Sequence, residues 1–325
     1  MTALAPFTFR SFRGEADYEH FARLSNRCNV ADGVQMIDTA EDYANEYNHL
    51  VNCDPALDVS VVEVDGVPVA YQRTTWWPEE DGTHLYWLYG CVEPAWQHRG
   101  LGRELLRRGE QRLREVAAAH TRATAQLFSV YTPVQRAGKV ALFTRAGYTP
   151  ARHFYMMERP NLDDLPQVPL PAGLALRPVV AADLRTIWEA NEEAFRDHWG
   201  FAPRPDEYFE AWRSAPHHDH SLWQVAWDAA SQQVAGVAVN VINPGLNAQF
   251  GRLLGTVEEL SVRRPWRNRG LGRALLAASL CELRARGMTV AAIGVDSEHP
   301  TGAPHLYESV GFRTVTQSLV LRKPL

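Results

Sequence analysis

The stretch RNRGLGRALL at residues 267–276 repeats an earlier stretch, QHRGLGRELL at residues 97–106, at an offset of 170 residues (270 minus 100). Two further similarities keep the same order. Residues 305–312 (HLYESVGF) resemble residues 141–148 (ALFTRAGY), 164 residues apart (311 minus 147), and residues 174–177 (LALR) resemble residues 7–10 (FTFR), 167 apart (177 minus 10). Three landmarks in one order indicate a tandem duplication.

Each copy alternates strand and helix patterns, which predicts a mixed α/β fold. In the second copy, β-branched residues and length predict strands at 234–241 and 255–262. Leucines at helical spacing predict a helix over 272–286 that ends at Gly287. A short apolar run at 289–295 predicts a buried strand, and Tyr307 falls on the helix that follows.

Length and composition predict two globular domains. A chain of 325 residues is long for one core, so we expect domains at 1–160 and 173–325, joined by a proline-rich linker at 161–172. A net charge of −5 disfavours nucleic acid, no apolar run approaches the roughly 20 residues of a membrane span, and the four cysteines are scattered. We expect a cytoplasmic protein, monomeric or homodimeric, that binds neither membrane nor nucleic acid.

The glycine turn at 267–273 lies between a predicted strand and a predicted helix. Amides at a helix start attract anions, and glycine lets a diphosphate approach the backbone closely. Neither a third glycine for the dinucleotide fingerprint nor a terminal Gly-Lys-Ser/Thr is present. A lone turn of this kind is often only a tight corner, but two copies in matched context favour an anion site.

This arrangement resembles the GNAT (GCN5-related) N-acetyltransferases, in which Gln/Arg-x-x-Gly-x-Gly/Ala precedes a helix and a Leu-Tyr-x-x-x-Gly-Phe segment ends the domain. The fold implied is two tandem GNAT acyl-CoA N-acyltransferase domains. The tandem copies and the segment at 194–200 (AFRDHWG) are similar more narrowly to the mycothiol synthase group, in which the C-terminal domain is catalytic.

The resemblance implies that both turns bind the pyrophosphate of acetyl-CoA, and that the preceding strand, at 258–262 or 87–92, splays from its neighbour to pair with the pantetheine arm. The coenzyme-binding residues implied in the second copy are Leu260, Ser261, Val262, Arg267, Asn268, Arg269, Gly270, Leu271, Gly272, Arg273 and His299. Those in the first copy are Gly90, Val92, Gln97, His98, Arg99, Gly100, Leu101, Gly102 and Arg103.

The copies differ in residues that can move protons. Tyr307 occupies the position of the family's general acid, where the first copy has Phe143. Glu258 and then Glu259 are the candidate bases, since strand alternation puts only one of them on the cleft face, and the first copy has no carboxylate at 84–89. The family's strand glutamate aligns nearer Thr256. The alternative interpretation is that both glutamates are ordinary surface carboxylates and that Tyr307 only fills the core.

The acceptor is left open by the sequence, because acceptor pockets are built from variable loops. His198 and Trp199 either contact it or pack internally. The histidines at 217–220 lack the spacing of a zinc site, so we expect an exposed loop and no metal. We expect transfer of acetyl from acetyl-CoA to a primary amine of a small molecule or peptide by direct attack in a ternary complex. The alternatives are an acyl-CoA sensor without activity, and transfer to a hydroxyl or of a longer acyl group.

Overall fold

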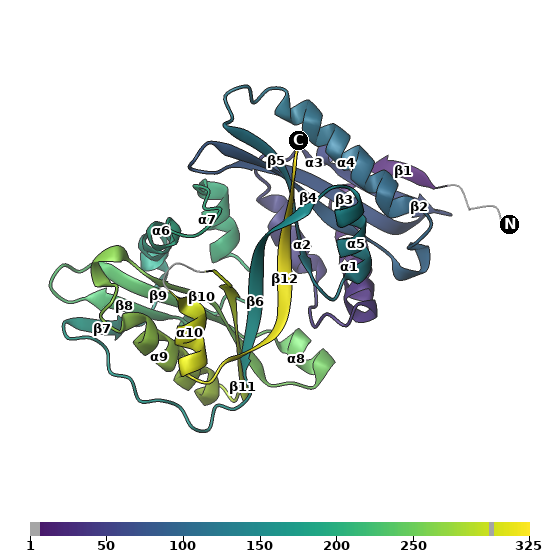
Figure 1. The fold of residues 1–325 in the computed structure, drawn as a ribbon. Helices are drawn as coiled ribbons and strands as arrows, with labels where there is room; N and C mark the ends of the chain where they lie inside the picture. The colour runs from purple at the N-terminus through teal and green to yellow at the C-terminus, as the bar shows by residue number, and fades with distance from the viewer. Residues whose placement is uncertain (1–6, 299–301) are drawn as a thin grey trace. The chain divides into compact units, whose positions relative to one another are not determined.

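The computed structural model describes residues 7–298 and 302–325, and the chain divides into two compact units (Figure 1). Unit 1 extends to Arg152 and includes Ser318–Leu325, and unit 2 is His153–Gln317. Within the described residues, every helix is too short or too polar to cross a lipid bilayer.

Unit 1 contains five strands of the first repeat and the end of the chain. Its strands are β1 (Thr8–Ser11), β2 (Val59–Val64), β3 (Val67–Pro78), β4 (Thr83–Val92) and β5 (Ala125–Pro133), with the later part of β12 (Arg313–Pro324). Its helices are α1 (Tyr18–Ala31), α2 (Ala40–Asn48), α3 (Pro55–Asp58), α4 (Leu101–Ala117) and α5 (Ala137–Arg145), with short 3-10 turns at Gly14–Asp17 and Pro94–Trp96.

Unit 2 repeats this plan. Its strands are β7 (Leu174–Arg177), β8 (Gln224–Asp228), β9 (Val234–Val241), β10 (Leu254–Val262) and β11 (Val290–Asp296), with the later part of β6 (Thr149–Arg159). Its helices are α6 (Leu184–Phe195), α7 (Asp206–Arg213), α8 (Pro244–Phe250), α9 (Leu271–Ala285) and α10 (Ala303–Ser309), with 3-10 turns at Ala181–Asp183, His220–Leu222 and Arg264–Trp266.

The two sheets have the same topology. Neighbouring strands run antiparallel through β1-β2-β3-β4 and through β7-β8-β9-β10. The next pair is parallel in each unit, β4 with β5 and β10 with β11. A parallel pair needs a crossover, which α4 and α9 supply. The tandem α/β fold expected from the sequence is therefore confirmed.

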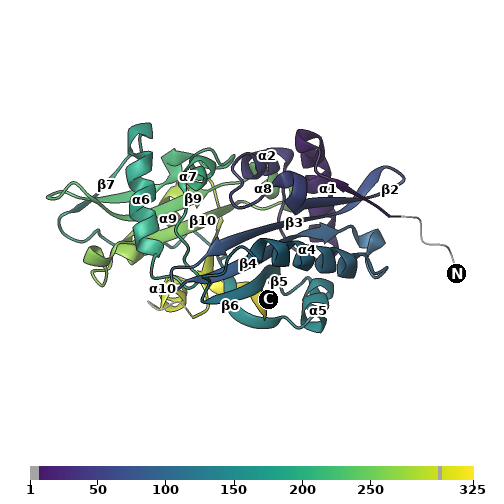
Figure 2. The same cartoon turned by 90° about the horizontal axis from the view of Figure 1, so that it is seen from above.

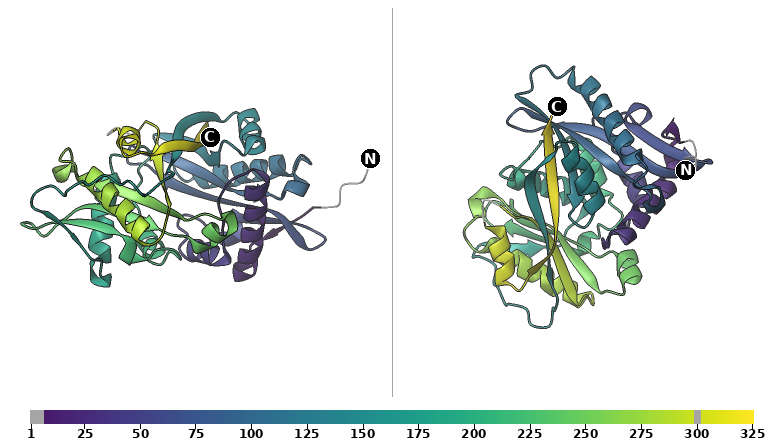
Figure 3. Two further views of the ribbon diagram at one scale, coloured as in Figure 1. Left: turned by 90° about the horizontal axis from the view of Figure 1, so that it is seen from below. Right: turned by 45° about the vertical axis from the view of Figure 1, so that its right-hand side comes forward.

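Helices cover both faces of each sheet because successive side chains of a strand point to opposite sides. In unit 1, Val61 packs with α1 and Val62 packs with α4, and Figure 2 shows these helices on opposite faces. In unit 2, Val237 packs with α6 and Ala238 with α9. Helix α9, yellow-green in Figure 3, lies along the green strands of unit 2.

The units differ from the sequence repeats in their last strand. Residues 318–324 at the chain end pair with β5 of unit 1, and residues 154–159 of the first repeat pair with β11 of unit 2. The expected boundaries at 160 and 173 therefore do not coincide with the compact units. The expected linker is also not free of the core, because Leu162 and Leu165 are buried in unit 2.

Leu321→Ala tests this strand exchange, because Leu321 is fully buried in the core of unit 1 although it belongs to the second repeat. We expect a loss of about 2–5 kcal/mol in unfolding free energy from the cavity, measured by chemical denaturation. The control is Val315→Ala on the same strand, where the side chain is 53% exposed and about 0.5 kcal/mol or less is expected. Equal effects of the two substitutions would contradict the exchange.

Candidate active site

The turn before α9 offers a row of unpaired backbone donors. Its backbone enters the left-handed region at Asn268 (φ 59°) and at Gly270 (φ 84°), the residue that caps the helix. The first helical bond runs from the Ala274 N–H to the Gly270 carbonyl at 3.1 Å. Among the described residues, the amides of 268–273 find no acceptor, so this corner can receive an anion.

Arg267 holds this turn in place rather than reaching outward. Its Nε donates to the carbonyl of Val262 at 2.9 Å, and its terminal nitrogens donate to Asp197 at 2.5 Å and to the Ala194 carbonyl at 3.0 Å. Arg264 also binds Asp197, and the hydrogen bonds of Arg264 and Arg267 lower the pKa of Asp197 below its ordinary value. The guanidinium of Arg267 is therefore committed to the protein.

Two other arginines of the turn are exposed. Arg269 and Arg273 have no hydrogen-bond or ion-pair partner within 7–298 and 302–325. Their charges are therefore the ones in this turn that are free to attract an anion.

Strand β10 leaves its parallel partner just before this turn. Its pairing with β11 ends at Val257 and Ile293, and in the described chain residues 258–262 have no strand partner on that side. A bulge at Glu258 shifts the register with β9 between Val257 and Glu259. The side of β10 that faces away from β9 therefore has no strand partner at 258–262 among the described residues.

Glu258 is paired with His218, which comes from the loop after α7. His218 Nδ1 donates to the carbonyl of Trp212 at 2.7 Å, and Nε2 lies 2.9 Å from Glu258 Oε2. Burial by itself lowers the pKa of His218, but the hydrogen bond and charge of Glu258 raise it above its ordinary value. This hydrogen bond therefore couples the protonation of His218 to the carboxylate of Glu258.

Glu259 lies beside the same histidine. Asn191 Nδ2 donates to Glu259 Oε2 at 2.6 Å, and Ser261 Oγ donates to Asn191 Oδ1 at 2.6 Å. Burial raises the pKa of Glu259, against the charge of Arg204. The charges of both glutamates act on His218, and the bulge interrupts the alternation of side chains from which one cleft-facing glutamate was expected. Which of the two serves as the base stays a prediction.

Tyr307 is buried on α10, with 5% of its surface exposed. Its ring packs against Phe312 at 6.2 Å. Its hydroxyl makes no hydrogen bond to any described residue. Burial raises the pKa of Tyr307 above its ordinary value, so the hydroxyl is protonated at neutral pH and has a proton to donate.

Unit 1 reproduces the turn but not the proton-moving groups. His98 (φ 59°) and Gly100 (φ 87°) repeat the backbone of Asn268 and Gly270, and Gln97 donates to the Val92 carbonyl at 3.0 Å as Arg267 does to Val262. The amides of 98–103 likewise find no acceptor among the described residues. Pairing of β4 with β5 ends at Trp87 and Ser129.

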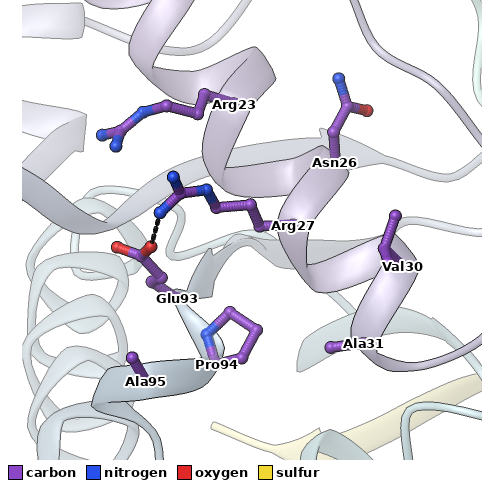
Figure 4. Close-up of a pocket in the computed structure, with 8 residues that line it drawn as sticks. All are labelled: Arg23, Asn26, Arg27, Val30, Ala31, Glu93, Pro94 and Ala95. Carbon is purple, nitrogen blue, oxygen red and sulfur yellow. Dashed lines mark hydrogen bonds and ion pairs between the residues drawn. The ribbon is translucent and has the colours of Figure 1, made fainter.

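An open groove of about 510 Å³ lies beside this first turn. Figure 4 shows Arg27 of α1 reaching toward Glu93 in the segment that leads into the turn, and Arg23 one helical turn earlier on the same helix. Arg27 forms an ion pair with Glu93, and Arg23 donates to the Pro68 carbonyl at 3.0 Å. The charge of Arg27 is therefore paired with a carboxylate, whereas Arg23 keeps its charge and donates to a neutral carbonyl.

The remaining predicted residues are placed as follows. His198 and Trp199 are half-buried, and the His198 ring packs edge-on against Phe195 at 4.4 Å. His299 lies outside the described residues. The loop at 217–220 is not simply exposed, because the His218 side chain is only 8% exposed. No group of three or more metal-ligating side chains occurs in the described part of the chain.

Each of the two matched turns lies at the start of a crossover helix and beside a strand that leaves its parallel partner, an arrangement that suits an anion. Sequence comparison identifies the family, since the profile of the acetyltransferase (GNAT) family matches residues 23–148 and 184–312. The chain belongs to the GNAT family and is an N-acetyltransferase with two GNAT domains.

Its curated relatives include mycothiol acetyltransferases. The protein of that name from Thermobifida fusca is 32% identical over 68% of this chain and 69% of its own length. The one from Salinispora arenicola is 30% identical over 79% and 78%. A GCN5-related N-acetyltransferase structure from Sphaerobacter thermophilus shares 27% identity with a TM-score of 0.69, covering 99% and 97% of the two chains.

A tandem GNAT protein from the clavulanic acid pathway shares the fold at 16% identity, with a TM-score of 0.66 over 98% of each chain.

Proposed function

We propose that unit 2 transfers the acetyl group of acetyl-CoA to a primary amine of a small molecule or peptide, and that unit 1 binds the coenzyme without turnover. The difference between two otherwise matched sites carries this proposal. Unit 2 has Tyr307, Glu258 and Glu259, and unit 1 has Phe143, Leu88 and Tyr89 at the corresponding positions.

The residues present fit acetyl-CoA. The unpaired amides of 268–273, with Arg269 and Arg273, suit a diphosphate. The unpaired edge at 258–262 suits the amides of a pantetheine arm. Bound there, the coenzyme supplies an acetyl thioester. His299 remains a proposed coenzyme contact on the family resemblance alone.

Proton transfer is assigned to the groups beside the splayed edge. We assign Glu258 as the base that accepts the proton of the attacking amine, with His218 orienting its carboxylate from the other oxygen. Tyr307 gives its proton to the departing thiolate. Direct attack in a ternary complex fits these roles, because both proton transfers then involve groups of unit 2.

The charges near the site favour a cationic acceptor. Three carboxylates, Glu258, Glu259 and Glu192, lie on β10 and α6. The positive charge of Arg204 acts against them, since it lies 3.3 Å from Glu192 and opposes the rise that burial causes in the pKa of Glu259. An alkylamine is protonated at neutral pH, so carboxylates attract it and then accept its proton. The names of the relatives favour an acceptor of the mycothiol type. The strand glutamate of the GNAT family aligns nearer Thr256 than Glu258. His198 and Trp199, in the turn that follows α6, are the proposed acceptor contacts.

Release of free thiol from acetyl-CoA in the presence of an amine panel, with desacetylmycothiol among its members, tests this function. We expect release that depends on one class of primary amine. Binding of acetyl-CoA without thiol release would indicate a sensor. Release with hydroxyl acceptors, or only from longer acyl-CoA, would identify the other alternative.

Glu258→Gln is expected to lower turnover at neutral pH by about 100-fold, which is the usual contribution of a general base. It should also lower the pKa of His218 measured by NMR, because the amide removes the charge that raises it. Glu259→Gln is the matched variant. Loss of turnover in Glu259→Gln alone would identify Glu259 as the base. Unchanged turnover in both variants would show that neither glutamate is the base.

A further inference from the structure

Lys139 is a primary amine in unit 1 that the proposed chemistry does not use. The chain has only two lysines, Lys139 and Lys323. Lys139 lies in the first turn of α5, one helical turn before Phe143. At the repeat offset of 164, unit 2 has Ala303 in its place (303 minus 139). The amine is therefore a feature of the unit without Tyr307.

The amine reaches the splayed part of β4. Lys139 Nζ donates to the carbonyl of Gly90 at 3.3 Å. Gly90 lies beyond Trp87, where pairing with β5 ends. A Cβ at Gly90 would come within 2.2 Å of the Tyr71 carbonyl, so the strand needs glycine there. At the offset of 170, Gly90 corresponds to Leu260 of unit 2. The carbonyl that accepts from Lys139 therefore lies on the edge of β4 that matches the unpaired edge of β10.

The surroundings of Lys139 raise the fraction of its amine that is neutral. The side chain is half-buried. Burial, followed by the charge of Arg136, lowers the pKa of Lys139 to about 8, although Cys91 of β4 and Cys28 and Asp32 near the end of α1 act in the opposite direction. A lysine of ordinary pKa has roughly 100-fold less neutral amine near neutral pH.

We propose that Lys139 is an internal acyl acceptor, which acetyl-CoA bound to unit 1 acetylates at Nζ. This inference rests on the proposed binding of acetyl-CoA by unit 1. The neutral amine attacks the thioester carbonyl, an N–C bond forms as the C–S bond breaks, and the proton released from nitrogen passes to the coenzyme thiolate. The products are N-acetyl-lysine and free coenzyme A.

The reaction is a single event for each chain. Phe143 stands in place of Tyr307, so the thiolate takes the proton lost by the amine rather than one from a tyrosine, and we expect the transfer to be slow. The acetylated side chain cannot be charged and adds bulk at Gly90, where the arm of a second coenzyme would lie. Acetylation of Lys139 therefore closes unit 1 to further coenzyme.

The test uses the full chain with isotopically labelled acetyl-CoA, followed by peptide mass mapping. We expect up to one acetyl group per chain at Lys139, at a rate that rises with pH and is half-maximal near pH 8. Lys323 is an internal control, since it is engaged with Glu110 at 2.8 Å, and should be labelled at least about 10-fold more slowly. Lys139→Arg should keep the cation and lose the label.

Two matched turn variants show whether the acetyl group on Lys139 comes from acetyl-CoA bound to unit 1 or from acetyl-CoA bound to unit 2. Gly100→Asp places a carboxylate in the turn of unit 1 and should abolish labelling, whereas Gly270→Asp in unit 2 should leave it intact. Calorimetry with acetyl-CoA counts the sites in each variant. If Gly100→Asp removes a site but the native chain carries no label at Lys139, the inference fails while the coenzyme site in unit 1 stands. If unit 1 shows no site and Lys139 no label, both fail. Equal labelling of Lys139 and Lys323 would also overturn the inference.

Discussion

Gly270→Asp is expected to lower kcat/KM for acetyl-CoA by roughly 100-fold or more. Like charges brought together cost several kcal/mol, and each 1.4 kcal/mol is about tenfold. The aspartate carboxylate would take the place of the diphosphate beside the amides of 268–273. Steady-state kinetics with varied acetyl-CoA measures the effect.

The substitution should leave the fold intact. Gly270 has φ 84°, a region that aspartate tolerates better than most residues. Apart from its chain neighbours, no atom of the described residues lies within 4 Å of an added Cβ. Aspartate is also a favoured helix cap. Gly100→Asp is the matched control, and it should retain turnover. An unchanged kcat/KM in Gly270→Asp, or an equal loss in Gly100→Asp, would contradict the assignment of unit 2.

Tyr307→Phe is expected to lower kcat by about 100-fold, within the usual contribution of a general acid. The phenyl ring keeps the contact with Phe312 and removes a hydroxyl that has no partner among the described residues, so the Tm should change little. Phe143 at the matching place in unit 1 is 6% exposed, which shows that this fold packs a phenyl ring there. Turnover equal to that of the native protein would exclude Tyr307 as the acid.

Local pattern was sufficient to predict the elements around the site. The strand expected at 234–241 is β9 with the same bounds, and the helix expected over 272–286 is α9 shifted by one residue. These predictions are confirmed because β-branched runs and helical spacing are local signals. The turn at Gly270 was also visible, since its glycines stand between a strand and a helix.

Features that depend on distant contacts could not be predicted. An apolar final strand fits the edge of either sheet equally well, so the pairing of residues 318–324 with β5 has no local signal. The bulge at Glu258 adds one residue without changing composition. His218 lies 40 residues from Glu258 in the sequence. From the sequence, the histidines of its loop could be said only to lack the spacing of a zinc site.

The sequence also could not show which arginines of the glycine turn are bound to other residues of the protein and which are exposed. Arg267 and Arg269 look alike in the glycine turn, but Arg267 is bound to Asp197 and two carbonyls, and Arg269 is exposed. Asp197 forms ion pairs with both Arg264 and Arg267 beside the glycine turn. The pairing of Asn191 with Glu259 and Ser261 likewise depends on how α6 packs on β10.

An NMR titration of the amide-labelled chain with coenzyme A tests the central claim most directly. We predict large shifts of the Gly270, Leu271 and Gly272 amide resonances on binding, because these N–H groups would donate to the diphosphate. Saturable binding of the coenzyme that leaves these three resonances in place would contradict the account.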